Sequence, residues 1–243
     1  MNSIHLIRCT GIILLILTFS TTCKKDKEET TTANSEIKDI DGNVYKTITL
    51  GSQNWMQENL KTTHFSNGDI ISNGNGIGIE WLILSFPAYA WYAFDFTEES
   101  FSSVYGLYYN WNAVKDSRNI CPEGWHVPTD QEWTILTDYL GGLKVAGGKM
   151  KTKGTIEDGT GLWLGPNVAT NSSGFSVLPA AGKTGNGSYW TIGHDGYFWT
   201  STEASGETAW IRMFMGFTSE MYRLSDNGLK YYGYPVRCIK DSR

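Results

Sequence analysis

The chain has 243 residues, of which 40% are apolar and 19% charged, and this balance excludes a wholly disordered protein. The 20 basic and 25 acidic residues give a net charge of −5 without a basic stripe, which argues against a nucleic-acid partner. The 10 Trp and 27 Gly indicate a loop-rich fold with an aromatic core, and the length indicates one domain.

Residues 1–22 have the pattern of an export signal. Arg8 precedes the apolar run 11–19, which is too short for a comfortable membrane-spanning helix. Cys23 follows and leads directly into the charged run 24–29. A cysteine between a short apolar run and a charged stretch resembles the processing site of a bacterial lipoprotein.

At such a site the acylated thiol of Cys23 would hold the protein on a membrane. Ser20 and Thr22 depart from the usual residues of the motif, and similar variants resemble those of Bacteroidota lipoproteins. The alternative is an ordinary secretory signal in which Cys23 is incidental. Residues 23–36 lack large apolar side chains and are expected to form a flexible tether. Their charge cluster favours an outer-membrane lipoprotein on the cell surface over one that faces the periplasm.

Residues 37–51 predict a hairpin with a tight turn at Asp41-Gly42. Asp39, Asp41 and Asn43 have a spacing superficially like that of a calcium loop. Leu50 stands where the last acidic ligand of such a loop would be, so we expect no calcium there.

Residues 66–80 are rich in Gly and Asn and predict an irregular loop. Residues 81–96 form an aromatic and aliphatic run broken by Pro87. We expect a buried segment here. An exposed apolar loop, which would be a partner site, is the alternative.

The clearest helix signal begins at Thr129, which can cap a helix, with Glu132 three residues later as the second half of a capping box. An apolar stripe then runs from Trp133 to Leu140, and Gly141-Gly142 ends the helix.

A shorter helix is expected over residues 144–151. The sum is an α+β fold with two helices at most, several short antiparallel strands and long loops, in a single domain of residues 37–241. The strand-like runs near the end of the chain are 197–202, 209–214, 220–224 and 234–239.

The four cysteines divide into two groups. Cys9 would leave with the signal and Cys23 would be acylated, so an oxidising compartment predicts a disulfide between Cys121 and Cys238. A pair of buried free thiols is the alternative. No metal site is expected near either cysteine, because the histidines are scattered and lack ligand spacing. Beyond the expected signal, these are His64, His126 and His194.

Several motifs in order resemble the Fibrobacter succinogenes major paralogous domain, a family found largely in exported proteins and lipoproteins of Bacteroidota and Fibrobacterota. The resemblance covers residues 37–241, and the run 81–96 stands as an insertion in the usual pattern. The motifs are Asp41-Gly-Asn-Val-Tyr45, Trp55-Met-Gln-Glu-Asn-Leu-Lys61, Tyr105-Gly-Leu-Tyr-Tyr-Asn-Trp-Asn-Ala-Val114, Cys121-Pro-Glu-Gly-Trp-His-Val-Pro-Thr-Asp-Gln-Glu-Trp133, Ala146-Gly-Gly-Lys-Met-Lys151, Asn171-Ser-Ser-Gly-Phe-Ser-Val-Leu-Pro179, Phe198-Trp-Thr-Ser-Thr-Glu203 and Val236-Arg-Cys238.

Two of these motifs, residues 127–133 and 236–238, also resemble the formylglycine-generating enzyme family. That resemblance implies a C-type-lectin-like architecture. The copper-binding cysteine pair of those enzymes has no counterpart among the available cysteines. The calcium-dependent sugar motif of lectins is also missing, because Trp111-Asn112 is followed by Ala113. Neither activity is therefore implied, and we expect no cofactor.

Sequence motifs of common enzyme classes are absent, including the Gly-x-Ser-x-Gly elbow, His-Glu-x-x-His and a phosphate loop. Glu123, Asp130 and Glu132 are close in sequence and could form a carboxylate pair, but helix capping explains Glu132 better. We therefore expect no catalytic residue.

Recognition remains as the expected role. Trp and Tyr offer rigid contact area with a polar edge, although Trp in such a fold is usually core. We expect a non-catalytic cell-surface lipoprotein that binds a glycan or a protein. The rivals are a structural component of the envelope or a surface filament, and an enzyme of unfamiliar type. No ligand is assigned; the candidate contact residues are Trp111, Trp163, Trp190, Trp199 and Trp210.

Overall fold

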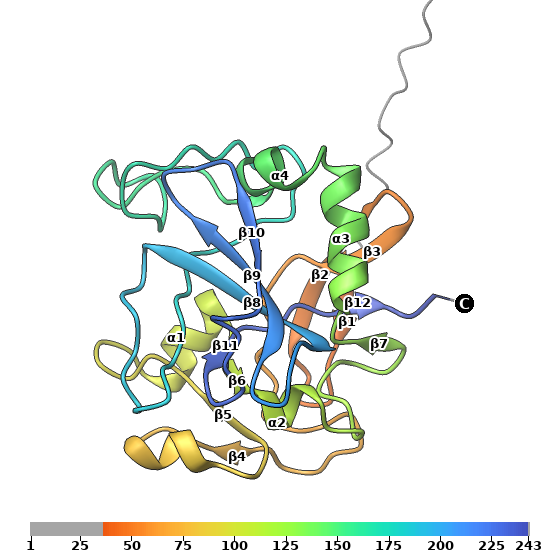
Figure 1. Ribbon diagram of the computed structural model, residues 1–243, viewed down its shortest axis with the longest axis vertical. Coiled ribbons are helices and arrows are strands. Elements are labelled where there is room, and N and C mark those ends of the chain that lie inside the picture. Colours follow the sequence, from red (N-terminus) through yellow and green to blue (C-terminus); the bar gives the residue numbers. More distant parts are fainter. Residues whose placement is uncertain (1–35, 243) are drawn as a thin grey trace, which may run out of the picture. The chain divides into compact units, whose positions relative to one another are not determined.

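The computed structural model describes residues 36–242. The expected signal, the lipidation site Cys23 and nearly all of the expected tether lie outside the described residues. The described part combines helices with mostly antiparallel sheets, which confirms the predicted α+β class (Figure 1). Across the described range, no helix is both long enough and apolar enough to cross a bilayer.

A five-stranded sheet joins the start of the described chain to its end. The predicted hairpin is present, with Ile37 opposite Tyr45. Its turn is closed by Asp39, whose carboxylate accepts hydrogen bonds from the Asn43 backbone (2.9 Å) and from the Tyr45 hydroxyl (2.6 Å). The strands, in order across the sheet, are β1 (Glu36–Lys38), β2 (Val44–Leu50), β3 (Gln53–Met56), β12 (Ile239–Lys240) and β7 (Trp125–His126).

A three-stranded antiparallel meander forms the second sheet. Its strands contain or overlap the runs predicted at 197–202, 209–214 and 220–224. Five consecutive residues of β8, 196–200, are buried, which places this strand in the core. They are β8 (Asp195–Glu203), β9 (Ala209–Met215) and β10 (Met221–Leu224).

The third sheet has four strands. The two adjacent strands at one of its edges come from the inserted run 81–96 and from the loop before it. The predicted run 234–239 is divided, because Pro235 has no N–H for a sheet ladder and follows the strand β11 directly. All pairs are antiparallel except β4 with β5. The strands, in order, are β11 (Gly233–Tyr234), β6 (Tyr108–Asn110), β5 (Ala88–Ala90) and β4 (Ser72–Asn73).

Four α-helices are present in the described residues, so the prediction of two at most is wrong. The two expected helices are there, but two more were missed. One is capped by Thr97 and Ser100, a capping box without the Glu or Gln that marks the usual pattern. The other is a single turn, too short to show a period. The helices are α1 (Glu98–Tyr105), α2 (Trp111–Val114), α3 (Asp130–Tyr139) and α4 (Leu143–Met150), with the 3-10 helix η1 (Ile79–Ile83).

The core holds a buried cation among aromatic rings. Trp133 of α3 points inward as predicted, with its ring centroid 4.9 Å from that of Trp55. The guanidinium of Arg237 lies 4.6 Å and 5.1 Å from the ring centroids of Phe175 and Phe198. Burial lowers the pKa of Arg237 to about 9. The segment between β11 and β12 therefore crosses the core, which fixes the loops on either side of it.

Candidate functional site

The inserted run at residues 81–96 is only partly buried, so the prediction of a buried segment is wrong. Trp81 and the strand β5 are buried, whereas Leu82, Ile83 and Phe94 are 40%, 75% and 72% exposed. The reason lies in η1, whose three residues per turn direct neighbouring side chains to different sides, so that Trp81 faces the protein while the next two residues face solvent.

Two asparagines anchor the insertion to the family motif that follows it. The side chain of Asn110 accepts a hydrogen bond from the Ala88 backbone (3.0 Å) and donates one to the Phe86 carbonyl (2.9 Å). Asn112 donates to the Leu84 carbonyl at 2.9 Å. The Trp-Asn-Ala sequence therefore uses its asparagine to hold backbone rather than to bind an ion.

A hairpin of residues 182–190 packs against the insertion. Lys183 pairs with Tyr189 across it. At its tip Gly187 has φ +84°, and a Cβ there would lie 2.6 Å from the carbonyl oxygen of Gly78. Only glycine accepts both this backbone conformation and this approach, so the tip rests directly on the loop before η1.

A second glycine brings a third segment to the same place. A Cβ on Gly185 would lie 2.4 Å from the Tyr231 ring and 3.0 Å from Leu82. Ring contacts continue from the hairpin to the far end of the insertion. We call the resulting surface the aromatic patch. It consists of Leu82, Ile83, Tyr92, Phe94, Tyr189 and Tyr231, all exposed or half-buried.

Lys183 fastens the hairpin beneath this patch. Its buried ammonium group lies 4.4 Å from the Tyr189 ring centroid and 5.1 Å from that of Trp81. It donates hydrogen bonds to the Gly187 carbonyl and the Tyr189 hydroxyl, both at 3.1 Å. Burial lowers the pKa of Lys183 to about 8. These contacts of the Lys183 amine stabilise the packing of the hairpin against the insertion. Because the amine is buried, a substrate cannot reach it, and it cannot act as a nucleophile.

Most of the tryptophans singled out in the sequence are core residues. Trp111, Trp163 and Trp199 are almost fully buried, so they cannot contact a partner. Trp190 and Trp210 are half-buried. The sequence therefore overestimated Trp, and the exposed aromatic groups of the insertion are Phe and Tyr instead.

The two half-buried tryptophans are each engaged by a neighbour. Trp190 stacks on Tyr197 and Tyr234, at interplanar angles of 28° and 17°. The guanidinium of Arg223 lies 3.7 Å from the ring centroid of Trp210. Both rings therefore have one face covered, and neither belongs to the aromatic patch.

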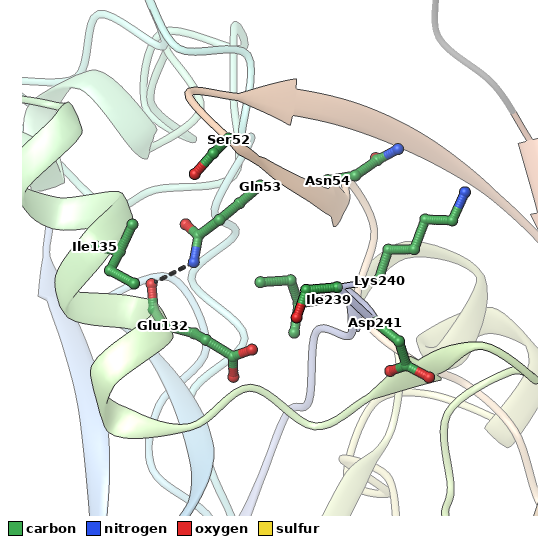
Figure 2. Close-up of a pocket in the computed structure, with 9 residues that line it drawn as sticks. Ser52, Gln53, Asn54, Glu132, Ile135, Ile239, Lys240 and Asp241 are labelled. Atoms are coloured by element: carbon green, nitrogen blue, oxygen red, sulfur yellow. Dashed lines mark hydrogen bonds between the residues drawn. The ribbon is translucent and has the colours of Figure 1, made fainter.

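A pocket of about 340 Å³ lies elsewhere, between β3, α3 and the end of β12. Figure 2 shows Gln53 reaching across it to the backbone carbonyl of Glu132, at 2.9 Å, while Lys240 points away. It is lined by Ser52, Gln53, Asn54, Glu132, Ile135, Ile239, Lys240, Asp241 and Ser242.

His126 sits beside this pocket but cannot serve as a base. Its Nε2 is 2.9 Å from Glu132 and its Nδ1 is 2.6 Å from Asp241. The hydrogen bond to Glu132, together with that to Asp241, raises the pKa of His126 to about 9. Because the ring is protonated at neutral pH and both nitrogens donate to carboxylates, no lone pair is left to activate Ser52 or Ser242.

The carboxylates that the sequence placed close together have separate tasks. Glu132 completes the capping box, as predicted, through the Thr129 backbone at 2.7 Å. Burial opposes its ionisation, but the hydrogen bonds from His126 and Thr129 outweigh burial and lower its pKa. Asp130 instead pairs with Arg212 and Arg223, each at 2.8 Å.

Two shallower hollows also contain acidic groups. Asp195, whose pKa is raised by burial, lines one of about 220 Å³ with His194. Glu98 and Glu99 line the other, of about 450 Å³, with Asp41. In Asp41, hydrogen bonds from Thr63 and Thr62 overcome the effect of burial and lower the pKa.

Metal ligands do not gather in the folded part. Among residues 36–242, no group of three or more His, Cys, Asp or Glu side chains is arranged to hold an ion. The apparent calcium loop is occupied by its own turn, in which Asp39 binds Asn43 and Tyr45. Asp41 binds Thr63 and His64.

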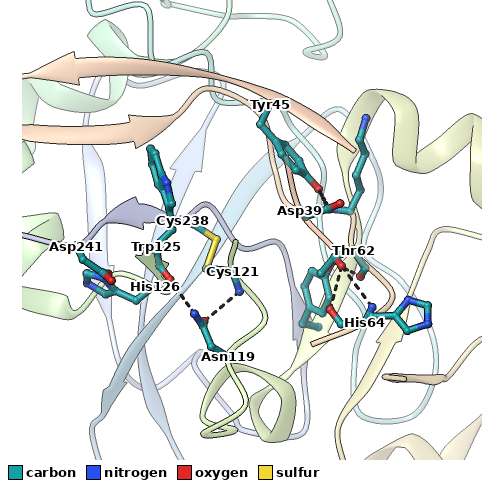
Figure 3. Close-up of a disulfide and its surroundings, with 12 residues drawn as sticks. Asp39, Tyr45, Thr62, His64, Asn119, Cys121, Trp125, His126, Cys238 and Asp241 are labelled. Atoms are coloured by element: carbon teal, nitrogen blue, oxygen red, sulfur yellow. Dashed lines mark hydrogen bonds and ion pairs between the residues drawn. A yellow bond between two sulfur atoms is a disulfide. The ribbon is translucent and has the colours of Figure 1, made fainter. Parts of the chain in front are cut away.

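The disulfide that the sequence predicted is present. Cys121 and Cys238 are bonded at 2.05 Å and are both buried (Figure 3). Asn119 shapes the approach to the bond: it accepts from the Cys121 backbone (3.0 Å) and donates to the Trp125 carbonyl (2.7 Å). The bridge thus ties the segment before α3 to the segment before β12.

Most of the chain matches the model of one known protein family. The family model of the Fibrobacter succinogenes major domain matches residues 48–240. The matched range includes the disulfide, α3 and all residues of the aromatic patch. No curated protein and no solved structure matches the chain.

Proposed function

The chain belongs to the Fibrobacter succinogenes major domain family, and on that premise we propose that it is a non-catalytic lipoprotein of the cell surface that binds a glycan or a protein through the aromatic patch. The observation that carries this proposal is the patch itself. Its rings come from three segments of the chain, and two of these segments, about 95 residues apart in sequence, are in direct ring contact. The ring centroids are 5.2 Å apart for Tyr92 and Tyr189 and 5.8 Å apart for Phe94 and Tyr189.

Rings fixed in this way suit recognition. Tyr and Phe lose little side-chain freedom on binding, and here much of that freedom is already removed by mutual contact. The anchors beneath them, Asn110 and Lys183, have no exposed chemistry of their own. The lack of a free base beside the pocket of Figure 2 also supports a binding role over catalysis.

We extend the proposal to a C-type-lectin-like architecture. The features that support it are the capped helix α3, the strand β12 beside β3 in a sheet that unites both ends of the domain, and the long loops between them. Loops held by a rigid scaffold commonly carry binding residues, and the insertion and hairpin 182–190 are such loops.

The lipid anchor is proposed from the sequence pattern around Cys23. Mass spectrometry of the mature N-terminus tests it, and we expect Cys23 as the first residue with acyl chains on its thiol. Protease treatment of intact cells tests surface exposure, and we expect the folded part to be released. A mature chain that begins elsewhere, or that carries no acyl group, would contradict the proposal.

Binding is tested with the full-length protein in detergent on a glycan array and in pull-downs. We expect Phe94→Ser to remove binding, because it deletes the most exposed ring of the patch. Phe217→Ser is the matched control and should bind normally, because Phe217 lies outside the patch and is 61% exposed, against 72% for Phe94. Equal loss in both variants, or turnover of a substrate by the wild-type protein, would contradict the proposal.

A further inference from the structure

Charge is strongly segregated along the chain. Residues 62–114, which include the insertion, contain no Lys or Arg and five acidic residues. Residues 139–156, which include α4, contain four Lys and no acidic residue. The negative and positive charges of these two segments would cancel if the segments lay side by side. The electrostatic potential at the surface therefore depends on where the fold places each segment.

The two blocks lie apart in the structure. Figure 1 shows α4 and β4 at opposite ends of the described part. Glu80 and Asp95, which adjoin patch residues in the sequence, are exposed, and neither takes part in an ion pair with another described residue. One end of the domain therefore joins exposed rings to unpaired negative charge.

The other end joins exposed apolar side chains to positive charge. Hydrogen bonds hold loop 165–170 against α4 and the segment that follows it. The Thr170 backbone donates to the Gly148 carbonyl (2.7 Å), and the Asn167 side chain donates to the Thr152 and Gly154 carbonyls (2.9 and 3.0 Å). We call this surface the basic end. Its exposed residues are Leu143, Lys144, Val145, Lys153 and Val168.

The lysines of the basic end are free to meet a partner. Lys144 and Lys153 are exposed and form no ion pair with any residue the structure describes. Lys149 and Lys151 are excluded from this role. Lys149 donates to the Leu140 carbonyl (2.8 Å), and Lys151 is buried on the carbonyls of residues 215, 216 and 218.

We propose that the aromatic patch of one molecule docks on the basic end of a second copy of this chain. This inference rests on the proposed function, in that the patch is the binding surface, and it names the partner. A second copy fits because one chain carries both complementary surfaces, apolar against apolar and negative against positive. Two patches facing each other would bring like charges together, which disfavours a symmetric dimer.

Docking of unlike surfaces has a structural consequence. The contact is head-to-tail, so each molecule keeps one free patch and one free basic end. Because the surfaces lie at opposite ends, repetition builds a row of molecules rather than a closed pair. Association should also weaken as salt rises, because the paired charges lie at the surface.

A charge exchange in the full-length protein tests this geometry by sedimentation velocity in detergent. Glu80→Lys with Asp95→Lys reverses the charge beside the aromatic patch, and Lys144→Glu with Lys153→Glu reverses the charge of the basic end. We expect each pair alone to weaken association at least about tenfold and the four changes together to restore it. Glu207→Lys with Asp226→Lys, exposed changes outside both surfaces, should leave association unchanged.

Mixing provides the second measurement. Phe94→Cys and Val145→Cys molecules should form a disulfide-linked pair when mixed and oxidised, whereas neither alone should do so. A wild-type protein that stays monomeric, four changes that fail to restore association, or cross-linking of Phe94→Cys with itself would each overturn the inference. Glycan binding by the Lys144→Glu, Lys153→Glu protein is read separately, so the proposed function can stand when self-association fails.

Discussion

Arg237 donates two hydrogen bonds to one side-chain oxygen of Asn59, at 2.7 and 3.2 Å, although 178 residues separate the two. No carboxylate forms an ion pair with this buried guanidinium in the described residues. Its charge is balanced instead by amide and carbonyl dipoles and by the faces of Phe175 and Phe198.

Asn59→Ala should therefore be strongly destabilising. It removes the principal acceptor of a buried cation, and hydrogen bonds to charged groups contribute about 1.5–3 kcal/mol each in such comparisons. We expect the free energy of unfolding in urea to fall by about 2–3 kcal/mol. Asn67→Ala, at an exposed turn, should change it by less than about 0.5 kcal/mol. Equal effects of the two changes would contradict this account.

The disulfide should contribute more than any single side chain. Cys121 and Cys238 are 117 positions apart, and the chain-entropy relation gives up to about 5 kcal/mol for a loop of that length. We expect the double change to Ser to lower the unfolding free energy by about 3–5 kcal/mol. Reducing agent should lower the stability of the wild type and leave the double variant unaffected. If reducing agent leaves the unfolding free energy of the wild type unchanged, the disulfide does not form.

The cluster around His126 predicts a pH dependence with a defined sign. The folded pKa of about 9 lies above the ordinary value of about 6.5, so the histidine contributes stability fully below pH 6.5 and loses it as pH rises through 9. Since a third of the side chain is exposed, solvent screening leaves about 1 kcal/mol of this contribution.

The measurement is the difference in unfolding free energy between wild type and His126→Gln. Buried Lys151 and Lys183, whose pKa values are lowered to about 8, act with the opposite sign and are common to both proteins. We expect the wild type to be the more stable at pH 6 and the difference to vanish near pH 10. A difference independent of pH would show that the carboxylates do not hold the charged ring.

Close packing of the hairpin on the insertion can be tested with two glycines of similar backbone conformation. Gly187 has φ +84° and would place a Cβ against Gly78, whereas Gly68 has φ +89° and open space around it. Gly68→Ala should cost about 1 kcal/mol for its conformation alone. Gly187→Ala should cost at least about 1 kcal/mol more, because the contact must also open.

The binding readout distinguishes the same two variants. Gly187→Ala should weaken any ligand of the aromatic patch, since the hairpin that carries Tyr189 is displaced. Gly68→Ala should bind like the wild type. Equal stability losses would indicate that the hairpin tip adapts without strain.

Local sequence signals predicted the elements that they govern directly. The capping box at Thr129 and Glu132, and the turn at Asp41-Gly42, act within four residues, and both are present in the structure. The disulfide followed from elimination among four cysteines. The α+β class followed from the mixture of short strand runs with one clear helix.

The aromatic patch could not be predicted from local sequence signals. Whether Phe94 or Trp199 is exposed depends on partners 90 or more residues away in sequence, and hydrophobicity alone favours burial of both. The docking of hairpin 182–190 depends on Gly185 and Gly187, whose need for close approach is visible only once the neighbouring segment is placed. The role of Arg237 was hidden likewise, because its acceptor Asn59 lies in a distant motif.

The position of β12 sets a condition on when the protein can fold. This strand lies between β3 and β7, so the five-stranded sheet has a gap until Ile239 and Lys240 are available. A nascent polypeptide leaving the ribosome cannot close that gap before residue 240 is synthesised. Until then β3 is paired on one side only, with β2, and β7 has no partner in this sheet.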